Sequence, residues 1–368
     1  MKILEVIFNF YSSGNVHFTV DLCNQLVADG HDVTLLSIAK PTENNCYYLD
    51  ELNPSCKLVT LNTRKTNAKT LYATYKMIKK IQADIVHINS IPATSMSTMA
   101  MLLYKKSKYG VTSHNQCQAE DMIKYKHHLR LIKTFFRKGL FDFVAISHEN
   151  EESIYDVYGK HAAKIIYNGR QFMPTTTELE SVRKKIDRLK NDDNTQVFTI
   201  LARCDKQKNI PRLIRCFNEA KKRGANIILL IIGSGYDNKI GIAAKADAGQ
   251  HIHFIDYCKN VADYLAVSDF FTLSSDFEGM PLSLIEALSY ECIPVSTPVS
   301  GVINIIKDGT TGFLAKDFTD EAYTDAIMRA VANKDNINKY ELKQLYENNF
   351  TMEICAKKYE EFFKSLQT

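Results

Sequence analysis

The sequence has no long apolar run. Its longest purely aliphatic stretch is Ile227–Ile232, six residues, far short of the roughly 20 that a membrane-spanning helix requires. Residues Met1–Phe10 are apolar enough to resemble an export signal, but Glu5 and Asn9 interrupt them and a Ser-Ser-Gly turn follows. We therefore expect neither a transmembrane helix nor a cleaved signal peptide.

Paired cysteines and a strong net charge are also missing. The 368 residues include nine cysteines without a Cys-x-x-Cys pair, so no zinc site or disulfide framework is indicated and we expect reduced thiols in a cytoplasmic protein. A net charge of +4 is too small to indicate nucleic-acid binding. With 45% hydrophobic and 24% charged residues, the chain has the composition of a globular protein long enough for two domains.

Short β-rich runs alternate with amphipathic stretches along the chain, which indicates an α/β protein with parallel sheets between helices. We expect strands at 2–8, 33–38, 85–88, 110–113 and 143–147, then at 197–201, 227–232, 251–255, 270–273 and 293–296. Helices are expected at 16–28, 211–223 and 282–289. The polar segment 171–194 is interpreted as a linker with a short polar helix, between domains 1–170 and 195–349. Two doubly wound domains would place a ligand crevice at the carboxyl ends of both sheets, in the cleft between them.

The segment Asp276–Leu288 carries the strongest chemical signal. Glu278 and Glu286 stand eight residues apart across a loop-to-helix junction, and Pro281 suits the start of a helix. The free amides of that first turn, together with the helix dipole, form an anion site suited to a diphosphate. Two glutamates at this spacing also occur by chance as a surface acid and a salt-bridged helical residue.

The residues around these glutamates resemble family 4 glycosyltransferases. Matching stretches are Ser268-Asp-Phe-Phe, Ser274-Ser275, Glu278-Gly-Met-Pro281, Glu286-Ala-Leu288, Ile293-Pro-Val295 and Asp308-Gly309. The sequence departs from the pattern at Cys292 and at Ser300, where the family usually has glycine. The resemblance implies the GT-B fold, retention of anomeric configuration and a C-terminal helix, about 350–368, that returns to the first domain. It also implies that Glu278 contacts hydroxyls of the donor sugar, Glu286 the ribose, and the backbone of Gly279, Met280, Pro281, Leu282 and Ser283 the sugar and distal phosphate.

Two basic residues follow the first strand of the second domain. Arg203 and Lys208 resemble the family's paired cations, which neutralise the diphosphate leaving group; a bidentate Arg and a point-charge Lys suit that role. Because these cations are present and Asp-x-Asp is absent, we expect no metal and no cofactor. Gly233, in a Gly-x-Gly turn, is a weaker candidate for the nucleotide site.

In the first domain, two positions are candidates by resemblance. Gly14 opens a helix after the first strand, where the family places amides against the donor phosphates. His114 ends a later strand, and the resemblance places it near the reacting sugar, where it would bond a hydroxyl or stabilise positive charge. His87 also ends a strand, but a packing role is favoured there, and Ser147 is interpreted as a helix N-cap.

Residues 122–140 form a basic amphipathic pattern outside these motifs. Its cations are Lys124, Lys126, Arg130, Lys133, Arg137 and Lys138, and its apolar face is Tyr125, Leu129, Ile132, Phe136 and Leu140. One interpretation is peripheral contact with an anionic membrane. The other is that the apolar face packs on the core while the cations are solvated.

The sequence thus predicts a retaining, metal-independent glycosyltransferase. It would move a hexosyl or N-acetylhexosaminyl unit from a nucleotide-sugar, with UDP favoured on family frequency, to a saccharide or lipid-linked saccharide in surface-polysaccharide assembly. The expected location is the cytoplasm or the inner face of the cell membrane. Two alternatives are a sugar-nucleotide 2-epimerase of the same fold and a non-catalytic sugar-nucleotide-binding protein.

Overall fold

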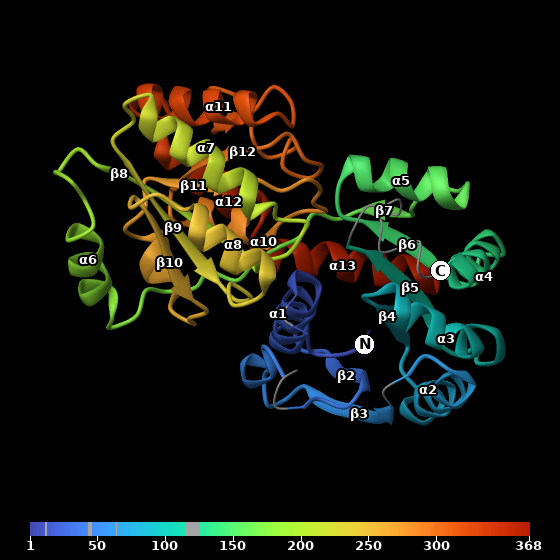
Figure 1. Cartoon of the computed structure of the whole chain (residues 1–368). Helices are drawn as coiled ribbons and strands as arrows, with labels where there is room; N and C mark the ends of the chain where they lie inside the picture. Colours follow the sequence, from blue (N-terminus) through green and yellow to red (C-terminus); the bar gives the residue numbers. More distant parts are fainter. Residues whose placement is uncertain (12, 43–45, 64, 115–125) are drawn as a thin grey trace. The chain divides into compact units, whose positions relative to one another are not determined.

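The computed structural model describes residues 1–11, 13–42, 46–63, 65–114 and 126–368. The chain forms two compact units (Figure 1). Unit 1 contains Met1–Gln171 and Asn349–Thr368, and unit 2 contains Phe172–Asn348. The structure therefore places most of the expected linker, residues 171–194, within the second unit.

Unit 1 is built on a parallel sheet with the order β3-β2-β1-β4-β5-β6-β7. Its strands are β1 (Lys2–Ile7), β2 (Asp32–Ala39), β3 (Lys57–Thr63), β4 (Ile85–Ile88), β5 (Lys108–Ser113), β6 (Asp142–Ala145) and β7 (Lys164–Ile165). The helices of this unit are α1 (Gly14–Ala28), η1 (Leu49–Glu51), α2 (Ala68–Ile81), α3 (Ile91–Leu103), α4 (Lys126–Arg137), α5 (His148–Tyr158) and α13 (Met352–Gln367). Strand residues such as Val6, Val86 and Val111 are fully buried in its core.

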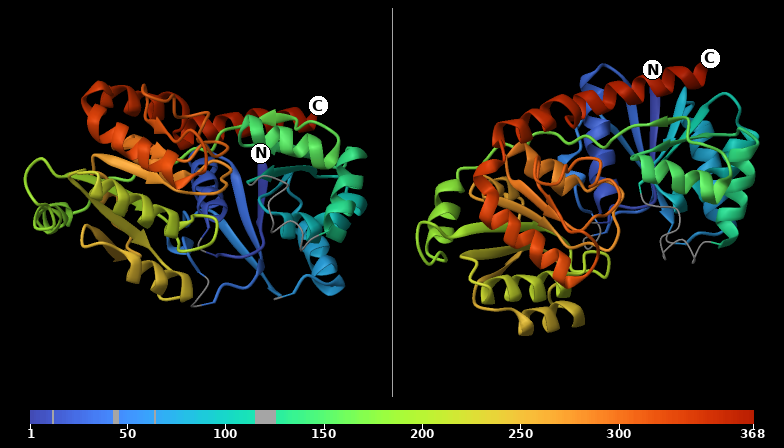
Figure 2. Two further views of the ribbon diagram at one scale, coloured as in Figure 1. Left: turned by 45° about the horizontal axis from the view of Figure 1, so that its top comes forward. Right: turned by 90° about the horizontal axis from the view of Figure 1, so that it is seen from above.

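The C-terminal helix α13 completes unit 1 by packing on α1 and β5 (Figure 2). Close packing is possible because β5 carries glycine at position 110, where a Cβ atom would lie 2.7 Å from the Phe362 ring. Gly169 likewise allows the start of the same helix to pack closely, since a Cβ atom there would lie 2.6 Å from the carbonyl oxygen of Thr351. The Asn168-Gly169 turn of the sequence thus marks a point where two distant segments meet.

Unit 2 has a six-stranded parallel sheet with the order β10-β9-β8-β11-β12-β13. Its strands are β8 (Gln196–Leu201), β9 (Ile227–Gly233), β10 (Ile252–Asp256), β11 (Phe270–Leu273), β12 (Ile293–Ser296) and β13 (Phe313–Leu314). Its helices are α6 (Leu179–Asp187), α7 (Ile210–Lys222), α8 (Lys239–Asp247), α9 (Val261–Leu265), α10 (Leu282–Ser289), α11 (Asp320–Asn333), η3 (Lys334–Asn336) and α12 (Lys339–Asn349). Helix α6 lies in the expected linker, yet its Val182 and Ile186 are buried against Val197 and Ile228 of the sheet.

Both sheets reverse strand order at one point, and these points position the candidate site. In unit 1 the order reverses between β1 and β4, and in unit 2 between β8 and β11. Loops leaving two neighbouring strands on opposite sides of a sheet open a crevice at their carboxyl ends. The predicted fold class, two doubly wound Rossmann-like α/β units, is therefore confirmed.

Candidate active site

In unit 2, the reversal point brings Lys208 and Glu278 together from loops 70 residues apart. The Nζ atom of Lys208, after β8, lies 2.6 Å from Oε1 of Glu278, after β11. The hydroxyl of Ser275 donates to the same oxygen at 2.6 Å, and Nε2 of Gln207 donates to Oε2 at 3.2 Å. Glu278 is only 5% exposed, so these three donors compensate for burial of its charge.

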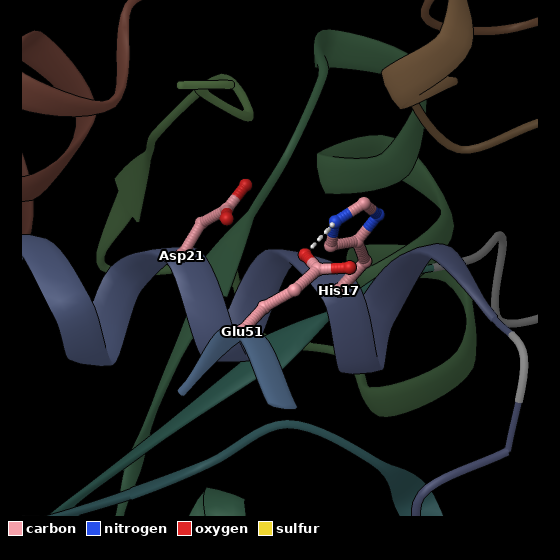
Figure 3. Close-up of side chains that lie close together, drawn as sticks. All are labelled: His17, Asp21 and Glu51. Atoms are coloured by element: carbon pink, nitrogen blue, oxygen red, sulfur yellow. Dashed lines mark hydrogen bonds and ion pairs between the residues drawn. The ribbon is translucent and has the colours of Figure 1, made fainter. Parts of the chain in front are cut away.

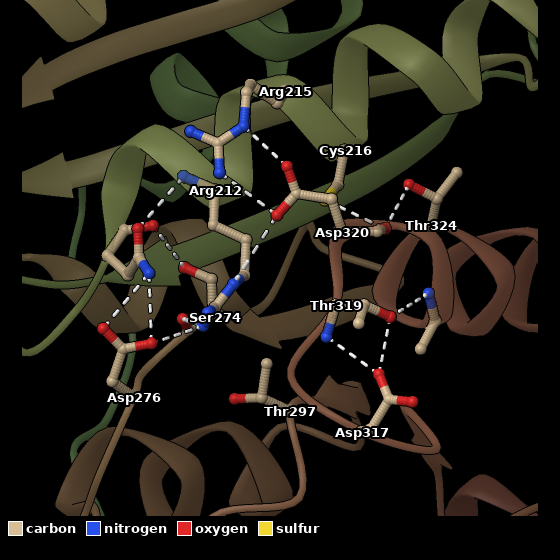
Figure 4. Close-up of polar contacts among 12 residues, drawn as sticks. Arg212, Arg215, Cys216, Ser274, Asp276, Thr297, Asp317, Thr319, Asp320 and Thr324 are labelled. Atoms are coloured by element: carbon tan, nitrogen blue, oxygen red, sulfur yellow. Dashed lines mark hydrogen bonds and ion pairs between the residues drawn. The ribbon is translucent and has the colours of Figure 1, made fainter.

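The loop that carries Glu278 is anchored to helix α7 (Figure 4). Asp276 accepts from Arg212 of α7 at 2.7 Å and from Nδ2 of Asn209, the N-cap of that helix, at 3.1 Å. The hydroxyl of Ser274 donates to the carbonyl oxygen of Lys208 at 2.8 Å. These contacts tie the two loops to each other at several points, so the geometry of the Lys208–Glu278 pair is held by its surroundings.

Helix α10 begins directly after the Glu278 loop. Pro281 is its N-cap and has no side-chain acceptor for the first-turn amides, and such amides at a helix start are suited to an anion. Gly279, Met280, Pro281 and Leu282 are buried, Ser283 is half-buried, and Glu286 is 7% exposed one turn further along. The structure places Glu286 and Glu278 in one loop–helix unit, and their proposed roles with ribose and sugar remain predictions.

A glycine on a neighbouring turn keeps this loop in place. Gly301 has a φ of +73°, and a Cβ atom there would lie 1.9 Å from the carbonyl oxygen of Gly279. No larger residue fits without moving one of the two loops. The family's second glycine at this turn is thus explained by close packing against the loop that carries Glu278.

Arg203 and Gly233 lie at the ends of adjoining strands β8 and β9. Arg203 is bound to Asp205 at 2.8 Å, and its side chain is 47% exposed; the Oδ1 atom of Asp205 also accepts from the backbone N–H of Lys208 at 3.1 Å. Gly233 has a φ of +154°, and a Cβ atom there would lie 2.0 Å from the carbonyl oxygen of Ala202. Gly233 is therefore explained by strand packing, while Arg203 lies at the surface in an ion pair with Asp205.

Gln207, Ser275 and Asp205 belong to this site although they were not predicted as site residues. Gln207 and Asp205 lie inside the Arg203–Lys208 motif, and Ser275 lies in the Ser-Ser motif. Their positions in those motifs were the available signal, but their partners depend on the pairing of β8 with β11.

In unit 1, the reversal point joins Asn15, Asn89 and His114. The Asn15 side chain donates to the carbonyl oxygen of Asn89 at 3.1 Å, and Nε2 of His114 lies 3.2 Å from Asn89 Oδ1. Burial, helped by the nearby His87, lowers the pKa of His114 to about 3, so the ring is neutral at physiological pH. Gly14 is exposed at the start of α1, and the N-cap residue Ser13 makes no side-chain capping hydrogen bond.

The other two unit 1 expectations concern His87 and Ser147. His87 is completely buried and bonded to Glu5 at 2.8 Å and Thr112 at 2.7 Å, which agrees with a packing role. Ser147 is the N-cap of α5, and its hydroxyl accepts from the backbone of Asn150 at 3.1 Å. Both predictions are confirmed.

A second cluster in unit 1 groups His17 and Asp21 of α1 with Glu51 (Figure 3). One ligand atom of each residue lies within 4.8 Å of the others, an arrangement that can hold a cation. However, His17 is bonded to Glu51 at 2.9 Å, and Asp21 forms a buried ion pair with Arg170. Burial raises the pKa of Asp21, although Arg170 opposes the shift. The guanidinium already neutralises this carboxylate, so the cluster is explained as a structural ion pair.

Only part of the basic segment 122–140 lies within the described residues, as α4 (Lys126–Arg137). Ile132 and Phe136 are fully buried, so the apolar face packs on the core. Lys133 donates to the Val157 carbonyl at 2.7 Å and Arg137 to that of Tyr158 at 2.9 Å. Arg130 and Leu131 stay exposed. Among the residues that the structure describes, every helix is too short or too polar to cross a membrane.

The two doubly wound sheets and their loops define a GT-B glycosyltransferase fold. Residues 13–170 match the model of Glycosyltransferase Family 4, and residues 181–349 match that of Glycosyl transferases group 1. The chain therefore belongs to the family 4, group 1 glycosyltransferases.

Known proteins of different specificities resemble the chain. It is 24% identical to a probable sucrose-phosphate synthase of Thermosipho melanesiensis over 69% of this chain and 60% of that protein. It is 26% identical to the Escherichia coli UDP-Gal:alpha-D-GlcNAc-diphosphoundecaprenol alpha-1,3-galactosyltransferase over 72% of this chain and 71% of that protein. The Anabaena HepE structure in complex with UDP and glucose superposes with a TM-score of 0.83 at 13% identity, over 99% of this chain and 100% of HepE.

Proposed function

We propose that this protein is a retaining glycosyltransferase that moves a hexosyl or N-acetylhexosaminyl unit from a UDP-sugar to a saccharide acceptor. The observation that carries the proposal is the buried Glu278, bonded to Lys208 beside the start of α10, where the N-cap is a proline. A carboxylate beside an anion site suits a ligand that combines sugar hydroxyls with a diphosphate. Glu278 is committed to donor hydroxyls, so the departing phosphate accepts the acceptor's proton on the same face of the sugar.

Stabilisation of the leaving group is the main catalytic device in this proposal. Arg203 is 47% exposed, and in this proposal its guanidinium exchanges Asp205 for the diphosphate, while Lys208 supplies a second positive charge. Fixed charges around a developing dianion lower the barrier because they need little reorganisation during reaction. The two cations replace a metal ion in this role, and transfer is proposed to be metal-independent.

The choice of UDP is supported by the names of two similar proteins. The Escherichia coli relative is named for UDP-Gal, and HepE was crystallised with UDP and glucose.

The acceptor is proposed on two observations. The name of the Escherichia coli relative includes an undecaprenol-linked acceptor, and Arg130 and Leu131 of α4 are exposed. We therefore propose a lipid-linked saccharide as acceptor, used at the inner face of the membrane in glycoconjugate assembly. A membrane role for α4 is tested by co-sedimentation of the protein with anionic vesicles. If Arg130→Glu binds the vesicles as well as the wild type does, α4 has no such role.

The donor site is tested by calorimetry with UDP, GDP, ADP and CMP, with and without Mg²⁺. We expect UDP to bind without metal and Arg203→Ala to weaken that binding about 10- to 100-fold, since a charge-assisted contact contributes about 1.5–3 kcal/mol. Uridine, which lacks the diphosphate, should be unaffected by this substitution. The matched control is Arg215→Ala on the outer face of α7, where the arginine pairs with Asp320 at 2.6 Å.

The other outcomes separate the alternatives. If no nucleotide binds, the transferase proposal fails. If UDP binds but no sugar leaves any donor, a binding protein is indicated, and conversion of a free UDP-sugar to its 2-epimer would indicate the epimerase. If binding requires Mg²⁺, the metal-independent part of the proposal is wrong.

A further inference from the structure

The buried carboxylate of Glu5 organises the polar residues at the reversal point of unit 1. Glu5 is fully buried on β1 and accepts hydrogen bonds from Nδ1 of His87 at 2.8 Å and from Nδ2 of Asn89 at 2.7 Å. On the other side of the His87 ring, Nε2 is hydrogen-bonded to the hydroxyl of Thr112 at 2.7 Å. That hydroxyl is hydrogen-bonded in turn to the hydroxyl of Tyr359 in α13 at 2.9 Å. Among the described residues, the Asn89 branch leads to His114.

The carboxylate determines which way the Asn89 amide points. An ionised carboxylate only accepts hydrogen bonds, so the amide must present its NH₂ group to Glu5. Its oxygen is thereby turned toward His114, 3.2 Å from Nε2. Asn89 is completely buried, and turning the amide over would place its oxygen against the Glu5 carboxylate, which is unfavourable in a buried site.

The oriented amide in turn determines the proton position on His114. Because Asn89 Oδ1 can only accept, His114 Nε2 must carry the hydrogen. The ring is neutral, so Nδ1 is left with a lone pair and can accept a hydrogen bond but cannot donate one. Phe18 packs edge-on against the ring, with centroids 5.1 Å apart, and restricts its rotation.

We propose that Asn89 is a positioning residue that holds His114 as the neutral, Nε2-protonated tautomer, so that Nδ1 accepts a hydrogen bond from a substrate hydroxyl. The assignment of a substrate hydroxyl rests on the proposed function; the tautomer does not. The Asn89 carbonyl also holds Asn15 in the first turn of α1. One residue thus orients both the histidine and the beginning of the helix that carries Gly14.

The tautomer is measured by ¹H–¹⁵N NMR of the histidine rings in the full-length protein, assigned with a His114→Gln variant. We expect wild-type His114 to show a protonated Nε2 and an unprotonated Nδ1 at neutral pH. Asn89→Leu, which removes the acceptor, should give a mixture of tautomers. Thr112→Val is the matched control, because it removes the other branch of the Glu5 network at similar volume and should leave the His114 pattern unchanged.

A wild-type His114 protonated at Nδ1 would overturn the proposal, as would an unchanged, single tautomer in Asn89→Leu. If Asn89→Leu does not fold, Asn89→Ser replaces it, since serine is small and polar but too short to reach His114. In transfer assays we expect Asn89→Leu to lower kcat about tenfold, the effect of one hydrogen bond, with UDP affinity unchanged. An inactive wild type with the expected tautomer would contradict the proposed function alone.

Discussion

The reversal points of the two sheets have the same topology, but the side chains beyond the strand ends are charged in unit 2 and neutral in unit 1. In unit 2, charged pairs dominate: Lys208–Glu278, Arg203–Asp205 and Arg212–Asp276. In unit 1, the groups beyond the strand ends are the neutral Asn15, Asn89 and His114, and the charge of Glu5 is buried behind them. Cations and helix amides suit a phosphate, whereas amides and an imidazole suit hydroxyls. The comparison therefore supports the proposed binding of the diphosphate in unit 2, where Glu278 would also meet donor hydroxyls, and proposed contacts from unit 1 to hydroxyls alone.

The largest expected effect comes from neutralising the unit 2 carboxylate. Glu278→Gln keeps the shape of the side chain but leaves Lys208 without its anion and weakens acceptance from donor hydroxyls. We expect kcat to fall about 10²- to 10³-fold, a loss typical of one preorganised electrostatic contact. Steady-state kinetics with the donor identified by calorimetry measure it. Glu321→Gln on α11, which removes a surface ion pair with Arg223, is the control, and equal kinetics for the two variants would remove Glu278 from the site.

The packing of the unit 2 loop can be tested with two glycines of equal φ. Gly301 and Gly309 both have a φ of +73°, but a Cβ at Gly309 has no atom within 4 Å, whereas one at Gly301 meets the Gly279 carbonyl at 1.9 Å. Both alanine variants share the backbone strain of about 1 kcal/mol. Gly301→Ala should lose roughly 2 kcal/mol more and bind UDP more weakly. Urea unfolding and calorimetry compare them, and equal stabilities would show that the close approach is absent.

The neutral character of unit 1 has a pH signature. The pKa of His114 is lowered to about 3 from an ordinary value of 6.5, so the unfolded chain takes up this proton first as the pH falls. The free energy of unfolding therefore does not depend on the protonation of His114 above pH 6.5. It falls progressively as the pH drops from 6.5 to the folded-state pKa of about 3. Between pH 7 and pH 5 the wild type should lose about 1–2 kcal/mol more than His114→Gln.

Urea unfolding at the two pH values measures this difference. His161→Gln is the control, because His161 is 68% exposed in a surface pair with Glu151 and should behave like the wild type. If His114→Gln shows the same pH dependence as the wild type, the histidine is not a neutral buried group and the contrast between the two units weakens.

Local sequence predicted much of the fold and some of the site. The bounds of β4, β11, β12 and α10 match the expectations, since short apolar runs and a proline at a helix start are local signals. A short polar helix was expected in the linker, and α6 is that helix. Its place in unit 2 was not predicted, because the burial of Val182 and Ile186 depends on the distant strand residues Val197 and Ile228. The short strands β7 and β13 were missed because two residues are too few to show the alternation of apolar and polar positions that indicates a strand.

The residue types that can do chemistry were determined by the sequence alone: Glu278 before a helix start, Arg203 and Lys208 after a strand, and His114 at a strand end. Which of them meet was decided by tertiary structure. Pairing of β11 with β8 brings Gln207, Ser275 and Lys208 onto Glu278, and pairing of β4 with β1 brings Asn89 to Glu5. The physical reason is that hydrogen bonds of a few ångströms depend on strand order, which joins segments 70 or more residues apart and leaves no local pattern in the chain.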